Sequence, residues 1–286
     1  MGIDNVAAKM LLLLRNEQGI DFQKTIILGR QHNYLGPLLR RKIHTEFGLS
    51  KNSLPLDSVY ADELLQILGV VKPDILDVSN YESANVIHDM NKPIPQELME
   101  KYSTVIDIGT SEHVYNISQS LENLKSLCAP RGYVLMVSPA NNWLGHGFYQ
   151  FSPELFFRAF GTPSGFEIRN LFLVKLRPFG SIWYELNDPK IMGRRGTIFT
   201  KRRCYVAVIA TKVSRSTSQS QPQQSDYESA WAAPSISKLG NIYLNMPWVL
   251  RRLIELTMIP IKNRLNNKMK PVRFQWAEGR FLLNKK

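Results

Sequence analysis

The stretch TVIDIGTSEHV, residues 104–114, gives the clearest indication of how this chain folds. Residues 105–108 form a nearly continuous apolar run, which is typical of a strand buried on both faces. The run stops at Gly109, and Thr110 and Ser111 can then cap a helix. Apolar residues follow at helical spacing, at Val114, Ile117, Leu121, Leu124 and Leu127. The strand therefore brings residues 109–113 to the carboxyl edge of a sheet, where ligands bind in open α/β folds.

Strand-like and helix-like segments alternate on both sides of this stretch. We expect further strands at 24–29, 74–77, 86–88 and 132–137, and helices at 34–47, 61–68, 96–101 and from residue 152 onward. This alternation predicts an α/β fold with a Rossmann-like, doubly wound and mostly parallel sheet. Two later apolar runs, 166–176 and 204–212, predict an antiparallel edge. Between them, residues 177–203 are rich in Gly, Pro and Arg and predict a long loop or lid.

The composition divides the 286 residues into three parts. Residues 1–212 carry the apolar periodicity of one globular domain, whereas residues 213–233 begin with a Ser- and Gln-rich run that predicts a flexible linker. Residues 234–286 contain eleven Lys and Arg against two Glu, so they hold +9 of the formal net charge of +12. We predict a basic, amphipathic helical extension there. Because Arg251, Arg252 and Pro260 interrupt its apolar stretch, we do not expect it to span a membrane.

Cysteine usage and the first residues bear on the cellular location. Only Cys128 and Cys204 are present, far apart, which argues against a disulfide framework and a zinc–thiolate site, and we expect no metal. Lys9 lies inside the first apolar stretch, which has no basic region before it and no small-residue cleavage site. Val6 occupies the position where a myristoylation signal has Ser or Thr. These features predict a cytoplasmic protein.

Polar and glycine residues at the ends of the predicted strands carry a family resemblance. They lie in the segments IILGRQHN (26–33), ILDVSNYESA (75–84), VIHDMNKPIP (86–95), the Glu112-His113 pair and LKSLCAPRGYVLMVSP (124–139). In this order and spacing, residues 24–176 resemble class I S-adenosylmethionine (SAM)-dependent methyltransferases, in particular the small-molecule enzymes of the methyltransferase type 11 kind. The resemblance implies SAM as the cofactor.

The resemblance also implies the residues that hold this cofactor. Gly29 would let the backbone approach the methionine part, because glycine has no Cβ. Asp77, with Ser79 nearby, would accept hydrogen bonds from both ribose hydroxyls. Asp89 would meet the adenine edge, and Glu112 would lie close to the sulfonium group.

Structural interpretations of the same residues remain open. Asp77 can instead cap a following helix, and Asp89 can form a turn with Asn91. Gln31 and Asn33 stand where the family has two further glycines, which motivates a second hypothesis. In it the chain is a non-catalytic Rossmann-like binding module whose basic tail directs contact with a partner or a membrane.

Two histidines are candidate catalytic residues, because imidazole has an unperturbed pKa near neutrality. His113 follows the fourth strand, although it can also simply orient its loop, and His146 lies between two glycines. The segment around His146 resembles the substrate side of some family members, which makes Asn142, Trp143 and Tyr149 candidate substrate-binding residues. Such aromatic residues are also common in hydrophobic cores.

The leading functional hypothesis is methyl transfer from SAM to an oxygen or nitrogen of a small molecule or glycan precursor. For the basic tail, one reading is peripheral contact with an anionic membrane at the inner membrane face, and another is packing on the domain. Nucleic acid is the least favoured partner, because no recognition motif is present.

Overall fold

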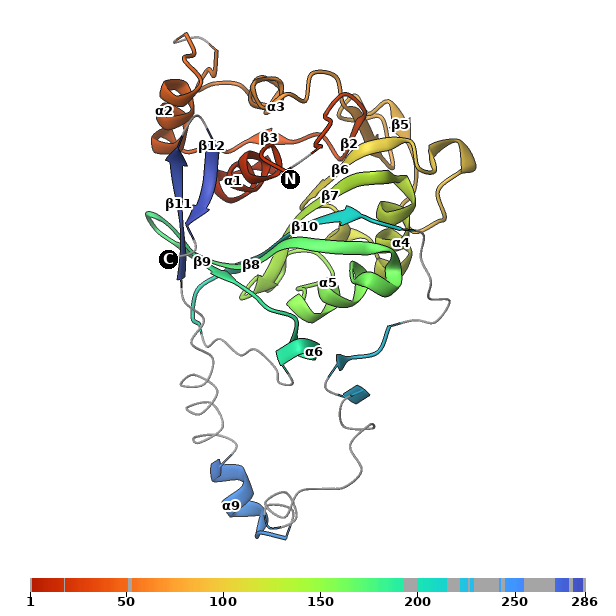
Figure 1. Ribbon diagram of the computed structural model, residues 1–286, viewed down its shortest axis with the longest axis vertical. Helices are drawn as coiled ribbons and strands as arrows, with labels where there is room; N and C mark the ends of the chain where they lie inside the picture. Colours follow the sequence, from red (N-terminus) through yellow and green to blue (C-terminus); the bar gives the residue numbers. More distant parts are fainter. Residues whose placement is uncertain are drawn as a thin grey trace.

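The computed structural model describes residues 2–17, 19–50, 53–192, 200–214, 222–225, 227–228, 242, 245–254, 271–277 and 280–284. Within them a sheet of ten strands runs in the order β12-β11-β9-β8-β10-β7-β6-β2-β4-β5 (Figure 1). Its strands are β2 (Thr25–Leu28), β4 (Asp74–Asp77), β5 (Val86–Ile87), β6 (Tyr102–Ile108), β7 (Cys128–Asn141), β8 (Phe166–Arg177), β9 (Gly180–Glu185), β10 (Cys204–Lys212), β11 (Pro271–Ala277) and β12 (Arg280–Asn284). A separate parallel pair is formed by β1 (Gly2–Ile3) and β3 (His32–Asn33).

The five strands β5, β4, β2, β6 and β7 are all parallel. Numbered along the chain, their order is third, second, first, fourth, fifth, which is the doubly wound order. The direction of winding therefore reverses between β2 and β6. The strands predicted from the sequence at 24–29, 74–77, 86–88, 104–108 and 132–137 are all confirmed.

The other half of the sheet is antiparallel. The two runs predicted as an antiparallel edge pair with each other as β8 and β10, and β10 also pairs with β7. Residues 177–203 are not one long loop, because β9 and the helix α6 (Pro189–Met192) lie within them. The prediction of a helical C-terminal extension is also wrong over its last part. Residues 271–277 and 280–284 form β11 and β12, which continue the sheet beyond β9. Apolar residues alternate there with polar ones, at Val272, Phe274 and Trp276, as a strand requires.

Helices cover both faces of the sheet, as the doubly wound prediction requires. One face packs against α1 (Asn5–Leu14), α2 (Pro37–Glu46) and α3 (Asp62–Leu68), and the other against α4 (Ile117–Leu127) and α5 (Pro153–Ala159). Neighbouring strand residues divide between the two cores: Ile27 faces the first, whereas Ile26 and Leu28 face the second. Short 3₁₀ helices lie at η1 (Gln96–Leu98), η2 (Ser111–His113) and η3 (Thr162–Ser164).

The first helix and the last strand pack together. Asp4 caps α1 by accepting hydrogen bonds from the N–H groups of Val6 and Ala7. The helix is apolar on almost every side and eight of its ten residues are buried, so it needs a cover on the side away from the sheet. The β11–β12 hairpin provides part of that cover (Figure 1). Phe281 is buried there, and its carbonyl accepts a hydrogen bond of 2.6 Å from the Asn16 side chain.

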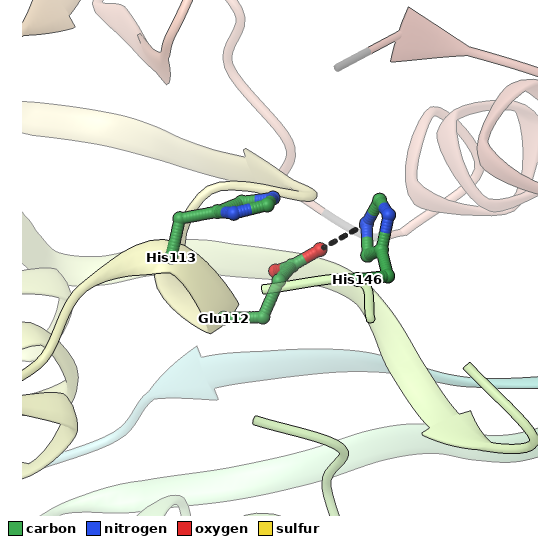
Figure 2. Close-up of side chains that lie close together, drawn as sticks. All are labelled: Glu112, His113 and His146. Carbon is green, nitrogen blue, oxygen red and sulfur yellow. Dashed lines mark ion pairs between the residues drawn. The ribbon is translucent and has the colours of Figure 1, made fainter. Parts of the chain in front are cut away.

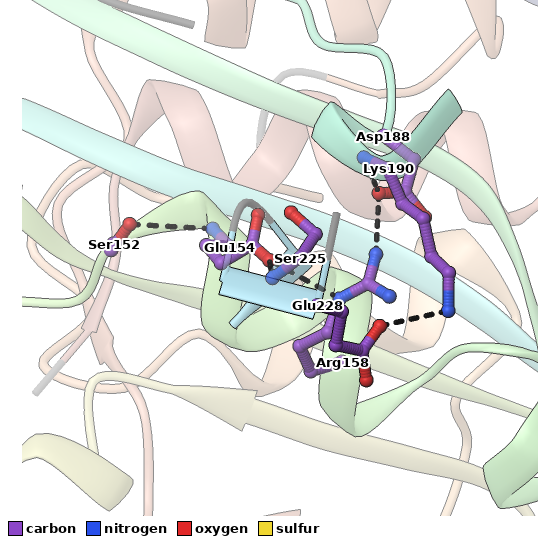
Figure 3. A network of polar contacts seen from close by, with 7 residues as sticks. All are labelled: Ser152, Glu154, Arg158, Asp188, Lys190, Ser225 and Glu228. Atoms are coloured by element: carbon purple, nitrogen blue, oxygen red, sulfur yellow. Dashed lines mark hydrogen bonds and ion pairs between the residues drawn. The ribbon is translucent and has the colours of Figure 1, made fainter. Parts of the chain in front are cut away.

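The segment predicted as a linker makes contacts where the structure describes it. Ser225 is buried, and its N–H donates to Glu154 Oε1 on α5 at 2.9 Å. Nearby, Arg158 of α5 pairs with Asp188, and a Lys190–Glu228 ion pair of 2.9 Å continues the network, in which Ser152 caps α5 (Figure 3). Here the prediction of a free linker differs from the structure, and most of the remaining residues between 215 and 233 lie outside the described ranges. None of the described helices has the length and apolarity needed to cross a membrane.

Candidate active site at the carboxyl ends of the parallel strands

The turn after β2 contains Gly29 but is otherwise packed. Gly29 has φ +68°, a conformation that suits glycine, and its N–H donates to the Leu76 carbonyl at 2.8 Å. The Gln31 side chain is buried, and its amide nitrogen donates to the carbonyls of Leu28 and Gly29, both at 3.1 Å. Gln31 thus fills space beneath the turn that a glycine would leave open. Its amide oxygen has no hydrogen-bond partner among the residues that the structure describes.

Asp77 ends β4 beside this turn. Asp77 is partly buried, whereas Ser79 is exposed. The Oδ1 of Asp77 accepts a long hydrogen bond of 3.4 Å from the N–H of Ser79. Residues 78–85 contain no helix, so Asp77 does not cap one. Because its other carboxylate oxygen has no hydrogen bond among the described residues, Asp77 retains the acceptor capacity that a ribose diol needs.

Asp89 follows β5 and forms a turn, the alternative raised from the sequence. Its Oδ1 accepts hydrogen bonds from the backbone N–H and the side-chain amide of Asn91, at 3.0 and 2.8 Å. These bonds lower the pKa of Asp89. A role for Asp89 in binding adenine stays a prediction.

The connection after β6 differs from the predicted helix start. Asp107 is fully buried, and its Oδ1 accepts the N–H groups of Thr110 and Ser111 at 3.0 and 3.4 Å. The Thr110 hydroxyl donates to the Leu28 carbonyl, so it does not act as a cap. Residues 111–113 form the 3₁₀ turn η2, and α4 begins only at residue 117, capped by Asn116.

Glu112 is the buried member of a three-residue cluster. The residue is 1% exposed, and its Oε1 lies 3.7 Å from Nε2 of His146. Its Oε2 is buried and has no hydrogen-bond partner within the described part of the chain. Burial, and secondly the Asp107 carboxyl, raises the pKa of Glu112 to about 8. His113 lies beside the same carboxyl group, and its ring makes an edge contact with that of His146, with the two centroids 5.1 Å apart (Figure 2). Burial, and secondly His146, lowers the pKa of His113, which favours the neutral imidazole.

The loop that carries His146 is fixed to Glu112 by the backbone. The Glu112 carbonyl accepts the N–H groups of Phe148 at 2.8 Å and Tyr149 at 3.3 Å. Gly147, which joins His146 to Phe148, has φ +69°, and a Cβ there would meet the Glu112 carbonyl oxygen at 2.8 Å. Only glycine permits this approach, so Gly147 helps to bring His146 to Glu112.

The predicted substrate-binding residues have structural contacts. Asn142 donates to the carbonyls of Thr200 and Arg202, at 3.0 and 2.7 Å. The Trp143 indole N–H donates to the Cys204 carbonyl at 2.9 Å, and its ring stacks on another aromatic ring. Tyr149 donates its hydroxyl to a carbonyl oxygen at 2.6 Å and stays only partly buried. These contacts attach the loop to its surroundings, and the role of the three residues toward a substrate stays a prediction.

Asp107 and Ser138 were not singled out from the sequence. Among the described residues, buried polar atoms without a hydrogen-bond partner recur at the carboxyl ends of β2, β6 and β7, at Gln31 Oε1, Asp107 Oδ2, Glu112 Oε2 and Ser138 Oγ. The sequence contained a signal for two of them, since Asp107 interrupts an apolar strand and Ser138 ends one. Most buried polar atoms have a partner, so this concentration indicates a place where a ligand or water supplies the missing partners. These atoms lie around the topological switch point between β2 and β6, where doubly wound folds bind ligands.

Comparison with known proteins gives structural likenesses alone. No protein-family model matches the chain, and no curated protein shows significant sequence similarity to it. A Burkholderia thailandensis 1,6-didemethyltoxoflavin-N1-methyltransferase is 10% identical, with a TM-score of 0.40 over 73% of this chain and 80% of that one. The cyclase SpnF is 11% identical, with a TM-score of 0.40 over 73% and 81%. A SAM-dependent methyltransferase from Aquifex aeolicus is 13% identical, with a TM-score of 0.35 over 67% and 84%. At these values the likenesses assign neither an activity nor a ligand to this chain.

Proposed function

We propose that the chain binds SAM at the topological switch point between β2 and β6. It transfers the methyl group of SAM to an oxygen or nitrogen of a small molecule or glycan precursor. The observation that carries the proposal is a set of buried oxygens there, on Gln31, Asp107 and Glu112, that have no hydrogen-bond partner among the described residues. An unmet buried acceptor costs about 1–3 kcal/mol, so such groups favour a ligand that supplies hydrogen-bond donors. SAM has two cationic centres and two ribose hydroxyls, which suit two carboxyl groups and an amide oxygen.

The residues have separate roles in this proposal. Gly29 faces the amino-acid part of SAM, Asp77 with Ser79 holds the ribose hydroxyls, and Asp89 lies on the adenine side. When bound, SAM supplies an electrophilic methyl group on a sulfonium sulfur. Transfer then depends on alignment of the acceptor atom, the methyl carbon and the sulfur. His113 and His146 promote loss of the acceptor proton, and residues 142–149 hold the acceptor.

Calorimetric titration of the full chain with SAM and S-adenosylhomocysteine tests the proposal. We expect binding at micromolar or lower concentration for both. Asp77→Ala should weaken it about 10- to 100-fold, because hydrogen bonds to a charged group contribute about 1.5–3 kcal/mol. Asp57→Ala is the matched control, since Asp57 is exposed and has no contact among those described. Absence of binding by the well-folded protein would exclude the enzymatic function.

The packed turn after β2 favours a second candidate, a non-catalytic Rossmann-like module. Gln31 lies under the turn, and the following residues pair with β1, so the space that glycines would open is occupied. If this candidate is right, the unmodified chain does not bind SAM, and Gln31→Gly lowers stability without creating a site. If the enzymatic proposal is right, Gln31→Gly retains or increases the affinity for SAM.

We also propose peripheral contact of the basic tail with anionic membranes. The helix α9 (Trp248–Leu253) presents Trp248, 72% exposed, and Leu250, 50% exposed, beside Arg251 and Arg252. We expect Trp248→Ser/Leu250→Ser to reduce sedimentation with phosphatidylserine vesicles, while β11 and β12 stay intact. Vesicles of phosphatidylcholine are the control, because they lack the negative charge that attracts arginine. Equal sedimentation of the variant and the parent would exclude this contact.

A further inference from the structure

We infer that Glu112, His113 and His146 form a binding site for a divalent transition-metal ion. Each residue offers one ligand atom, and these atoms all lie within 4.8 Å of one another. In Figure 2 the carboxyl group of Glu112 lies beside both imidazole rings, which also contact each other. Three ligands of this kind, one carboxylate and two imidazoles, are a set that zinc and similar ions bind in proteins.

The buried carboxyl group distinguishes this cluster from a chance group of surface residues. Glu112 Oε2 is buried and has no hydrogen-bond partner in the described ranges, although a protein normally satisfies such an atom. Within the described residues no Lys or Arg forms an ion pair with Glu112, and its one ion pair there is with His146. A metal ion beside His113 and His146 would give the buried carboxylate a cationic partner.

The backbone also holds the second segment in position. His146 is remote in sequence from Glu112, yet its loop is tied to Glu112 by two N–H groups that donate to the Glu112 carbonyl. Gly147 allows the close approach of the two backbones. The juxtaposition of Glu112 and His146 therefore does not depend on flexible side chains alone.

The geometry indicates the class of ion. Zinc–nitrogen bonds of about 2.0–2.1 Å place neighbouring tetrahedral ligands roughly 3.4 Å apart, and Glu112 Oε1 and His146 Nε2 are already 3.7 Å apart. His113 and His146 are exposed and can close the remaining distance by side-chain rotation. Imidazole ligands favour zinc, cobalt or nickel over magnesium and calcium, which prefer oxygen ligands. Three protein ligands leave at least one coordination position open, as catalytic sites do.

The role of the ion deepens the proposed methyl transfer and rests on it. An acceptor hydroxyl bound at the open position would have a lowered pKa, as metal-bound water does. Its proton passes to solvent, the oxygen–methyl bond forms as the carbon–sulfur bond of the sulfonium breaks, and a neutral thioether leaves. In this arrangement both imidazoles act as ligands and promote loss of the acceptor proton through the ion, without accepting the proton themselves, and the acceptor is a small molecule with a free hydroxyl group.

Titration with Co²⁺ tests the site without any need for SAM. The probe is Co²⁺ added to untagged, chelator-treated full-length chain, followed by its visible absorption. We expect one Co²⁺ per chain, displaced by Zn²⁺. His146→Ala and Glu112→Gln should each weaken binding at least about 10-fold, the lower end of the effect of losing a metal contact. His44→Ala is the matched control, because His44 lies on α2 outside the cluster and should leave binding unchanged.

Two outcomes would overturn the inference: no visible Co²⁺ spectrum, or a spectrum that His146→Ala leaves intact. His146 is exposed, so that variant stays informative if Glu112→Gln fails to fold. Binding of SAM without Co²⁺ binding would refute the metal site and leave the proposed function standing. Binding of Co²⁺ without SAM binding would support the metal site and refute the methyl transfer.

Discussion

Replacement of Gly147 by alanine tests how the loop that carries His146 is held. Gly147 has φ +69°, and Gly145, two residues earlier, has φ +79°. Alanine is strained by about 1–2 kcal/mol at either position, because L-residues disfavour this conformation. The surroundings differ: a Cβ at Gly147 would lie 2.8 Å from the Glu112 carbonyl oxygen, whereas a Cβ at Gly145 would meet nothing within 4 Å.

The difference in surroundings sets the expected magnitude. In Gly147→Ala the loop must move away from Glu112, so the two hydrogen bonds to the Glu112 carbonyl are weakened or lost. At about 0.5–1.5 kcal/mol each, they add about 1–3 kcal/mol to the backbone strain. We therefore expect the free energy of unfolding to fall by about 2–5 kcal/mol for Gly147→Ala and by about 1–2 kcal/mol for Gly145→Ala.

Urea denaturation of both variants and of the parent chain measures these values. The Gly145→Ala variant controls for strain alone, since it differs from Gly147→Ala mainly in the missing contact. If the two variants lose the same stability to within about 0.5 kcal/mol, the usual range of neutral surface changes, the close approach of Gly147 to Glu112 is not what holds the loop.

Three further predictions concern groups outside the site. Arg40→Leu removes a buried guanidinium that donates to three backbone carbonyls. In urea denaturation it should lower the free energy of unfolding by about 2–4 kcal/mol, and a loss near zero would contradict this. Cys128 and Cys204 are buried, and burial raises the pKa of Cys128 to about 12. Ellman's reagent should therefore label both thiols only in denaturant, and labelling of the native chain would refute their burial. Burial alone would raise the pKa of Asp74, but the Tyr102 hydroxyl and its other partners lower it. A lowered carboxyl pKa contributes stability above the unfolded value of about 3.9, which is lost as the pH falls through the folded value. Tyr102→Phe should therefore cost about 1 kcal/mol at neutral pH and less in acid; a cost that does not change with pH would exclude the interaction.

The parallel half of the sheet could be predicted because each of its strands is defined by its own residues. An apolar run followed by a glycine or an acidic residue indicates a buried strand wherever it pairs. The hairpin of β11 and β12 has the right alternation, yet it was predicted as a helix. Its strand character depends on the free edge of β9, which is distant in sequence and could not be inferred locally.

The candidate site, too, could be predicted from the sequence only in part. Glu112, His113 and His146 could each be recognised from their neighbours in the sequence, but their meeting depends on hydrogen bonds between backbones that the sequence does not reveal. The prediction that Thr110 and Ser111 cap a helix was wrong, because the buried Asp107 side chain accepts hydrogen bonds from their N–H groups. Such a competitor is visible only once the strand has been placed.

The contact between α1 and β12 has a consequence for synthesis on the ribosome. The helix α1 is buried on nearly all sides, and Phe281, which packs against the same core, emerges 265 residues after its hydrogen-bond partner Asn16. Until the final hairpin leaves the exit tunnel, part of the apolar surface of α1 stays uncovered. The nascent chain should therefore bind chaperones that recognise apolar segments and release them late.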